Sequence, residues 1–174
     1  MRRIIFIGTI HCGVTDEKEL ELLLSNYKPN QLLVEIAQED LDNKKLKPYP
    51  PEMVFGYKWA KKHKIQVNGF DSPINVLKEG LTAEHRKRIL DKQLAIIKKY
   101  NWKDFNKKYY CKKIGFYREY IDVEKNKRRN EEMVKNIEIL IQTRGIIVVL
   151  TGAGNLTYFE KHVKDTEFPL RYPK

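Results

Sequence analysis

Ile4-Ile5-Phe6-Ile7-Gly8-Thr9-Ile10-His11 is the stretch of this 174-residue chain that best indicates its fold. A short apolar run of this kind predicts a buried β-strand, and a histidine follows almost at once. Open α/β sheets gather their chemistry just outside the carboxyl ends of the strands. We therefore expect His11 to lie at the functional edge of a sheet.

Three further polar residues end or follow expected strands in the same way. Glu35 ends the run 31–35, Asp71 follows the run 65–70, and Asn155 closes the segment 146–155. If the strands are parallel, their carboxyl ends share one edge of the sheet. The side chains of His11, Glu35, Asp71 and Asn155 are then expected to converge there.

The order of elements predicts an α/β fold, with a mostly parallel or mixed open sheet of four or more strands flanked by helices. A helical insertion, about residues 76–145, separates the third strand from the last. Caps and apolar spacing predict helices at about 16–28, 51–64, 73–77, 82–97, 126–143 and 156–163. In the fourth of these, Leu90, Leu94 and Ile97 are expected to share a face.

The chain is long enough to bury a core without disulfides or a structural metal, and we expect residues 1–174 to form one domain. Cys12 and Cys111 show no spacing typical of a metal site or a disulfide framework and are expected to be reduced thiols. The opening apolar run is too short for a secretory signal, and no segment has the length of a membrane span. We therefore expect a protein without a transmembrane segment, located in the cytoplasm.

The formal net charge of +11 is concentrated in one segment. Residues 78–118 hold thirteen Lys or Arg and four Asp or Glu, interleaved with the aromatic residues Tyr100, Trp102, Phe105, Tyr109, Tyr110, Phe116 and Tyr117. This composition is compatible with nucleic-acid binding through phosphate contacts and base stacking. It also fits a solvated helical face, because 25 of the 34 basic residues are lysine and few arginines are present to read bases.

Each candidate site residue also has a structural interpretation. His11 fits a hydrogen-bonded histidine at a strand end, Asp71 could shape the turn before Ser72, and Asn155 could cap the final helix. Glu35 is harder to explain structurally, since a carboxylate after so apolar a run is costly to desolvate unless it is paired or bound to a cation. A Cys12 nucleophile activated by His11 is disfavoured, because adjacent residues at a strand end point in different directions.

The glycines of Gly152-Ala153-Gly154 let the backbone approach a ligand closely, and the N-H groups there could hold an anion. Neither of the glycine-rich nucleotide-binding motifs is present, so a nucleotide site is not indicated.

Several motifs, taken in their order along the chain, give a family resemblance. They are Gly8-Thr9-Ile10-His11 with Val34-Glu35, Gly69-Phe70-Asp71-Ser72-Pro73-Ile74, Arg129-Asn130-Glu131-Glu132-Met133, and Val148-Val149-Leu150-Thr151-Gly152-Ala153-Gly154-Asn155-Leu156. The chain thereby resembles the TraB/PrgY family and its relatives, the Tiki proteases, the GumN-like proteins and the erythromycin esterase/ChaN-like superfamily. The resemblance covers most of the chain and is sparse in the basic aromatic segment.

The resemblance implies an active centre built from a histidine of the first G-x-x-H motif, His11, and the strand-ending glutamate, Glu35. It further assigns Asp71 to the turn motif and Arg129 to the start of a helix. Two positions depart from the family pattern: Asn155 stands where a second histidine is usual, and Ser72 where the turn has arginine. An amide is a poor metal ligand and no base, so the first departure should weaken a metal site or remove a base.

The leading hypothesis is a metal-dependent hydrolase of the TraB/Tiki type, acting on a peptide, amide or ester. A divalent Mn, Co, Zn or Fe ion held by His11 and Glu35 would activate water, and Arg129 would stabilise the oxyanion. Alternatively, Glu35 is itself the general base, with a pKa raised by its apolar setting. Gly8, Asp71, Gly152, Gly154 and Asn155 complete the expected ligand-binding set.

Other functions stay open. The same pocket could serve a noncatalytic domain that binds a peptide, haem or another small ligand, while the basic insertion meets an acidic partner or nucleic acid. The site could also have a different specificity, or be completed by another subunit of a homo-oligomer.

Overall fold

The computed structural model describes residues 2–11, 13–113 and 120–173, and its centre is a parallel β-sheet. Within that part of the chain the strands are β1 (Arg2–Thr9), β2 (Gln31–Ala37), β3 (Gln66–Asp71), β4 (Gly145–Gly152) and β5 (Thr166–Glu167). Their order across the sheet is β3-β2-β4-β1-β5, and every pairing is parallel. The expected open, mostly parallel α/β sheet is confirmed.

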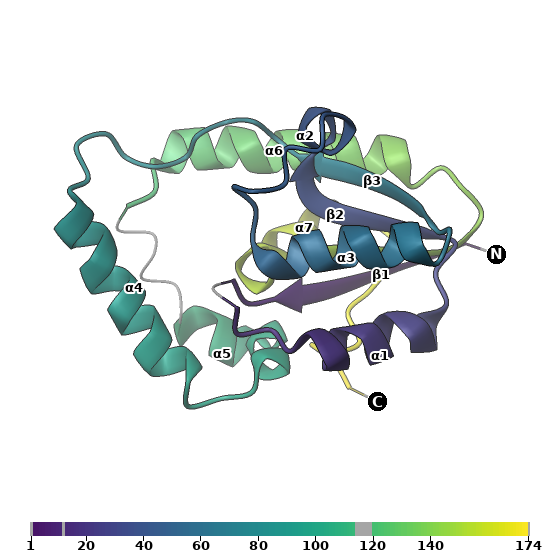
Figure 1. The fold of residues 1–174 in the computed structure, drawn as a ribbon, viewed down its shortest axis with the longest axis horizontal. Coiled ribbons are helices and arrows are strands. Elements are labelled where there is room, and N and C mark those ends of the chain that lie inside the picture. Colours follow the sequence, from purple (N-terminus) through teal and green to yellow (C-terminus); the bar gives the residue numbers. More distant parts are fainter. Residues whose placement is uncertain (1, 12, 114–119, 174) are drawn as a thin grey trace.

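Helices cover both faces of this sheet (Figure 1). The α-helices are α1 (Glu17–Tyr27), α2 (Gln38–Asp42), α3 (Pro51–Lys62), α4 (Ala83–Ile97), α5 (Lys108–Lys113), α6 (Val123–Leu140) and α7 (Leu156–His162), and the 3-10 turns are η1 (Trp102–Asn106) and η3 (Ala153–Asn155). Helices α1 and α3 pack on one face, and α6 and α7 on the other.

The two faces follow from strict alternation along buried strands. In β1, Ile5 and Ile7 join the core beneath α1 and α3, whereas Ile4 and Phe6 join the core beneath α6 and α7. The Phe6 ring stacks on Phe168 with centroids 5.1 Å apart. The sheet is therefore desolvated on both sides, as its continuous apolar runs require.

The connections around β4 reverse direction and create a crevice. Strands β1 and β2 lead into α1 and α3 on one face, whereas β4, which lies between them, leads into α7 on the opposite face. Loops that leave neighbouring strands toward opposite faces leave a gap at their carboxyl ends, where α/β proteins bind ligands. His11, Glu35 and the segment 152–155 all lie at this point.

The helical insertion between β3 and β4 is anchored beside β1. Asn106 of η1 is buried and accepts a hydrogen bond from the Gly8 N-H at 2.8 Å, and its amide donates to the Gly8 carbonyl at 2.8 Å. A Cβ on Gly8 would lie 2.8 Å from the Asn106 side-chain oxygen, so only glycine admits this contact. An antiparallel bridge between Leu77 and Ile121 ties the start of the insertion to the segment before α6.

Several helix predictions are confirmed at their caps. Asp16 caps α1 by accepting from the Glu19 N-H, Pro51 begins α3, and Thr82 caps α4 by accepting from the His85 N-H. These starts follow local chemistry and so are readable from sequence. The long final helix of the insertion was expected at about 126–143; it exists, but it runs from Val123 to Leu140 and is capped by Asp122.

Other predictions were wrong. Residues 73–77 form no helix: Ser72 donates to Glu132 of α6, and residues 72–76 have no regular secondary structure up to the Leu77 bridge. The helices and strands expected from sequence also did not include α2, or β5, whose two residues are too few to form a recognisable pattern. In α4, Ile97 of the expected face is buried and Leu90 is 40% exposed, and Ile89 is buried as well.

No helix in residues 2–11, 13–113 or 120–173 is long and apolar enough to cross a membrane.

Two isoleucines on α6 allow the core to be tested with a matched control. Ile137 is fully buried against the sheet, and Ile139 is 71% exposed. Ile137→Ala should lower the free energy of unfolding by about 2–5 kcal/mol, because it removes buried methyl groups and leaves a cavity. Ile139→Ala should change it by less than about 0.5 kcal/mol. Urea unfolding monitored by circular dichroism measures both, and equal effects would contradict this packing.

Candidate functional site

His11 is held at the carboxyl end of β1 by a short structured loop. The Thr15 hydroxyl accepts from the Ile10 N-H and donates to the Ile10 carbonyl, both at 2.9 Å. This clamp fixes the backbone immediately before His11. Cys12, which was not favoured as a nucleophile, lies outside the described residues.

The imidazole of His11 pairs with a buried glutamate. Its Nδ1 lies 2.5 Å from Oε1 of Glu52, in the first turn of α3, whose side chain is 1% exposed. An ionised carboxylate only accepts hydrogen bonds, so the ring proton is assigned to Nδ1 and the lone pair to Nε2. The second oxygen of Glu52, Oε2, is buried and has no hydrogen-bond partner in the described part of the chain. The histidine is thus oriented by a carboxylate that does little else.

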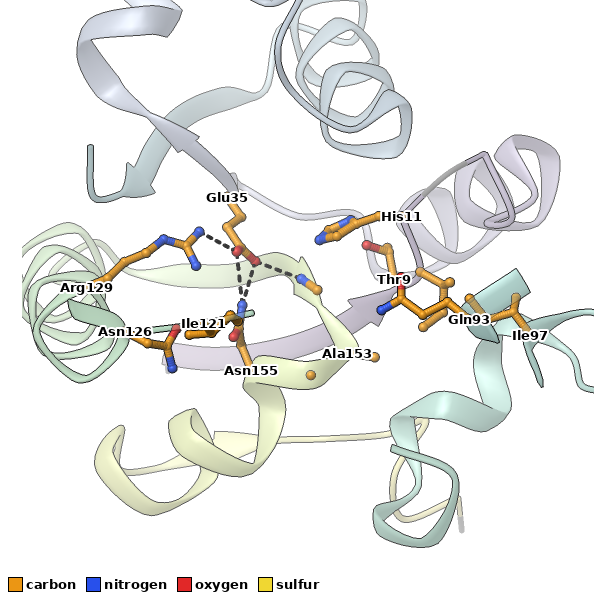
Figure 2. Close-up of a pocket in the computed structure, with 13 residues that line it drawn as sticks. Thr9, His11, Glu35, Gln93, Ile97, Ile121, Asn126, Arg129, Ala153 and Asn155 are labelled. Carbon is orange, nitrogen blue, oxygen red and sulfur yellow. Dashed lines mark hydrogen bonds and ion pairs between the residues drawn. The ribbon is translucent and has the colours of Figure 1, made fainter. Parts of the chain in front are cut away.

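Glu35 is surrounded by donors from three elements, as Figure 2 shows. Its Oε1 accepts from Arg129 at 2.9 Å and from the Asn155 amide at 3.0 Å. Its Oε2 accepts from the Thr151 hydroxyl at 2.5 Å, the Gly152 N-H at 2.8 Å and the Asn155 amide at 3.1 Å. A carboxylate offers about four lone-pair sites, so these contacts saturate it.

Arg129, on α6, bridges two carboxylates. Its Nη2 lies 2.9 Å from Oε1 of Glu35 and 2.8 Å from Oδ1 of Asp71, and its Nε donates to the same Asp71 oxygen. Asp71 also accepts from the Ser72 N-H at 2.7 Å. The third guanidinium nitrogen of Arg129, Nη1, takes part in none of these contacts.

Burial and charge together set the ionisation of this cluster. Burial raises the pKa of Glu35, but Arg129, His11, the Thr151 hydroxyl and the Gly152 N-H outweigh it, and the net pKa lies below its ordinary value. Burial, then the charge of Glu35, raise the pKa of Asp71 in spite of Arg129. Burial opposes the charge of Arg129, yet the two carboxylates raise its pKa. The expectation of a raised pKa for Glu35 was wrong, so Glu35 stays charged and is a weak base.

The pKa of His11 is raised by the carboxylates around it. Desolvation of the ring lowers its pKa, but the hydrogen bond and charge of Glu52, followed by the charge of Glu35, raise it more, and the net pKa lies above its ordinary value. The side chain is still 45% exposed and lines an open space, so a ligand can reach the imidazole ring. His11 is therefore the residue of this cluster best suited to exchange protons near neutral pH.

A cavity of about 300 Å³ opens between these residues and the helical insertion. Figure 2 shows His11 and Glu35 on the sheet side and Gln93, from α4, across from them. The described lining consists of Thr9, Ile10, His11, Glu35, Gln93, Ile97, Ile121, Asn126, Arg129, Gly152, Ala153, Gly154 and Asn155.

The cavity brings together six of the eight expected site residues: His11, Glu35, Arg129, Gly152, Gly154 and Asn155. The other two, Gly8 and Asp71, are not in its described lining. Gly8 donates its N-H to Asn106, which anchors the helical insertion. Asp71 accepts from Arg129 and so orients the guanidinium from outside the cavity lining.

Gly152 allows the two halves of the site to meet. A Cβ built on it would lie 3.0 Å from Nε2 of His11 and 3.7 Å from Oε2 of Glu35. Any side chain here would crowd the lone pair of His11. The glycine was expected to permit close approach of a ligand, and it also permits close approach of the histidine.

The donor set does not fit the expected metal. Glu35 has its lone pairs occupied and a guanidinium against one oxygen, so it cannot also ligate a cation without losing these bonds. His11 would be left as the single free ligand. The described residues contain no group of three or more His, Cys, Asp or Glu that could hold a metal ion. The residues present therefore do not support chemistry on a bound metal ion.

The aromatic side chains of the basic insertion are largely engaged with one another and with lysines. Lys113 lies over the rings of Tyr100, Tyr109 and Tyr110, at 5.2, 4.6 and 5.9 Å from their centroids. Trp102 and Phe105 are buried. Phe116 and Tyr117 lie outside the described residues. The described rings thus serve packing and cation–π contacts, which favours the structural interpretation of this segment.

Sequence reasoning missed Glu52 and Thr151. Glu52 follows Pro50-Pro51, where an acidic residue in a first helical turn usually only complements the helix dipole. A usable signal existed, because a helix that follows a parallel strand begins near the carboxyl edge of the sheet.

Thr151 lies inside the β4 run and looked like an ordinary strand residue. Asn155 precedes α7 as its N-cap residue, but its side chain makes no capping bond and donates to Glu35 instead.

The chain was compared with protein-family models, with curated proteins and with solved structures, and none of these comparisons finds a match. The site must therefore be interpreted from its own geometry.

Glu35→Gln should lower the free energy of unfolding by about 3 kcal/mol at pH 7, because Arg129 then loses one of its two buried partners. The folded-state pKa of Glu35 lies below the ordinary value of 4.5, so its stabilising contribution exists above that pH and is lost as the pH falls. The difference between the native protein and the variant should therefore shrink below about pH 4.5. Chemical unfolding across a pH series measures it.

Glu138→Gln, at an exposed position of α6, the helix that carries Arg129, is the control and should change stability by less than about 0.5 kcal/mol. A Glu35→Gln effect that stays constant down to pH 3 would contradict a charged, stabilising Glu35.

Proposed function

We propose that this protein is a hydrolase of small amide or ester substrates in which His11, oriented by Glu52, is the general base. The observation that carries the proposal is the 2.5 Å contact between His11 Nδ1 and a buried glutamate, with His11 lining a cavity of about 300 Å³. A histidine whose other nitrogen is fixed by a carboxylate is a standard arrangement for proton transfer in acyl-transfer enzymes.

The chemistry runs in two steps. Nε2 of His11 removes a proton from water as the water oxygen bonds to the substrate carbonyl carbon, which leaves a tetrahedral oxyanion and an imidazolium. The imidazolium then gives that proton to the departing oxygen or nitrogen as the bond to carbon breaks. The products are a carboxylic acid and an alcohol or amine, and Glu52 stabilises the imidazolium throughout.

Arg129 supplies the positive charge for the oxyanion. Its Nη1 is not used by Glu35 or Asp71, and those two carboxylates hold the guanidinium rigidly on the cavity wall. A donor fixed before the reaction stabilises developing charge without reorganising. Glu35 is thus a positioning residue in this proposal and not the base or a metal ligand.

His11→Ala should reduce kcat/KM by about 10²–10⁴, because general-base catalysis is lost. In the native protein kcat/KM should rise with pH through an inflection above the ordinary histidine value of 6.5, since the net pKa of His11 is raised. Glu52→Gln removes the carboxylate that raises this pKa, so the inflection should move to lower pH while the plateau falls. A panel of nitrophenyl esters and acyl-amino-acid nitroanilides gives the pH profiles.

Unchanged hydrolysis in His11→Ala, or an inflection that Glu52→Gln leaves in place, would contradict the assignment. Glu138→Gln, on the outer surface of α6, is the control for a general effect of losing a carboxylate.

Metal removal separates this proposal from the metal-dependent hydrolase that the sequence led us to expect. Dialysis of the purified protein against EDTA should leave kcat/KM unchanged within about twofold, because the proposed base needs no cation. Loss of activity on chelation and recovery with Mn, Co, Zn or Fe would restore the metallohydrolase hypothesis. Elemental analysis of the same samples checks the stoichiometry.

The noncatalytic binding domain is the competing outcome: ligands would bind in the cavity, and no substrate of the panel would be hydrolysed. The resemblance to the TraB/PrgY family and the cytoplasmic location stay predictions.

A further inference from the structure

A second compartment adjoins the catalytic cavity. It has a volume of about 380 Å³ and shares Ile121, Asn126, Gly154 and Asn155 with the first cavity as common wall. It extends from there between α6 and α7. A ligand whose reacting group lies near His11 can therefore reach into this compartment with its remaining part.

A residue that lines the second compartment has an unpaired acceptor. Asn130 of α6 is 7% exposed, and its side-chain oxygen Oδ1 is buried with no hydrogen-bond partner in the described part of the chain. Leaving such an atom unpaired costs about 1–3 kcal/mol. A turn of the Asn130 amide would bring this oxygen to the compartment, where a bound N-H donor would remove the cost.

The second compartment also has a single sign of charge. Lys161 of α7 is the one charged side chain in its described lining, alongside amides, hydroxyls and aliphatic groups. It is exposed, and none of the ion pairs within the described residues includes it. A lysine ammonium at the rim of a polar pocket attracts a small anion such as a carboxylate.

From these two groups we infer that the second compartment binds the carboxylate end of an acylated amino acid or peptide. Lys161 pairs with the terminal carboxylate, and Asn130 accepts from the neighbouring amide N-H. This inference rests on the proposed hydrolase and names its substrate class: amides and esters that carry a carboxylate next to an N-H. The shared wall then presents the acyl side of the substrate to His11.

The test is a binding titration with N-acetyl-alanyl-alanine and its C-terminal amide, using the full chain with His11→Ala so that no turnover occurs. The free acid should bind about 5-fold more tightly than the amide, because only the acid pairs with Lys161. Lys161→Gln should abolish this preference and leave the affinity for the amide probe unchanged. Lys164→Gln is the matched control, since Lys164 is not in the described lining of the compartment, and it should keep the preference.

The acceptor role of Asn130 is tested with N-acetyl-alanyl-lactate, in which an ester oxygen replaces the N-H. This probe should bind about 5-fold more weakly than the peptide, and Asn130→Leu should remove the difference. Asn130→Leu should also leave the protein folded, since the oxygen that it deletes has no partner to lose.

Equal binding of acid and amide probes, or equal effects of Lys161→Gln and Lys164→Gln, would overturn the inference. So would absence of binding by every probe at millimolar concentration. Parallel hydrolysis assays on the native chain separate the two proposals. Carboxylate preference without turnover would support the inference and contradict the hydrolase, whereas turnover without preference would do the reverse.

Discussion

The buried carboxylate of Glu35 is the constraint on which the rest of the site depends. A charged group with 6% of its side chain exposed can persist only if protein donors replace its water. Arg129, Thr151, Gly152 and Asn155 supply those donors, and they come from α6, β4 and η3. Satisfying one charge therefore fixes the relative positions of elements far apart in the chain.

The two glutamates of the site, Glu35 and Glu52, have different roles. Glu35 is saturated by donors, holds Arg129 and stays charged, so it organises the cavity. Glu52 is held less completely, since one of its oxygens has no partner among the described residues and the other orients His11. The same residue type thus serves as a structural ion in one position and as the partner of the proposed base, His11, in the other. Local hydrogen bonding decides which.

Asn155 stands where the resemblance to the TraB/PrgY family leads one to expect histidine. An asparagine amide cannot take up a proton as histidine does, but it can donate hydrogen bonds, and its Nδ2 donates to both oxygens of Glu35. The residue therefore supplies a donor to the carboxylate and no base to the cavity. In the proposed function, water activation accordingly falls to His11.

Much of the fold followed from sequence because the apolar runs 4–7, 31–34 and 146–150 are too continuous for anything but buried parallel strands. The convergence of His11, Glu35 and Asn155 followed too, since parallel strands share a carboxyl edge. The failures lie where nonlocal contacts decide the outcome: Ser72 bonds to Glu132 instead of capping a helix, and β5 exists only because β1 offers an open edge.

What the sequence by itself determined is the sheet, its functional edge and the residues that reach it, because hydrophobic periodicity and capping chemistry act over a few residues. What only the tertiary structure decided is their roles. Glu52 meets His11 across 41 residues of chain, and Arg129 meets Glu35 across 94. The pKa of a carboxyl depends on which donors surround it in space, and no local pattern encodes that.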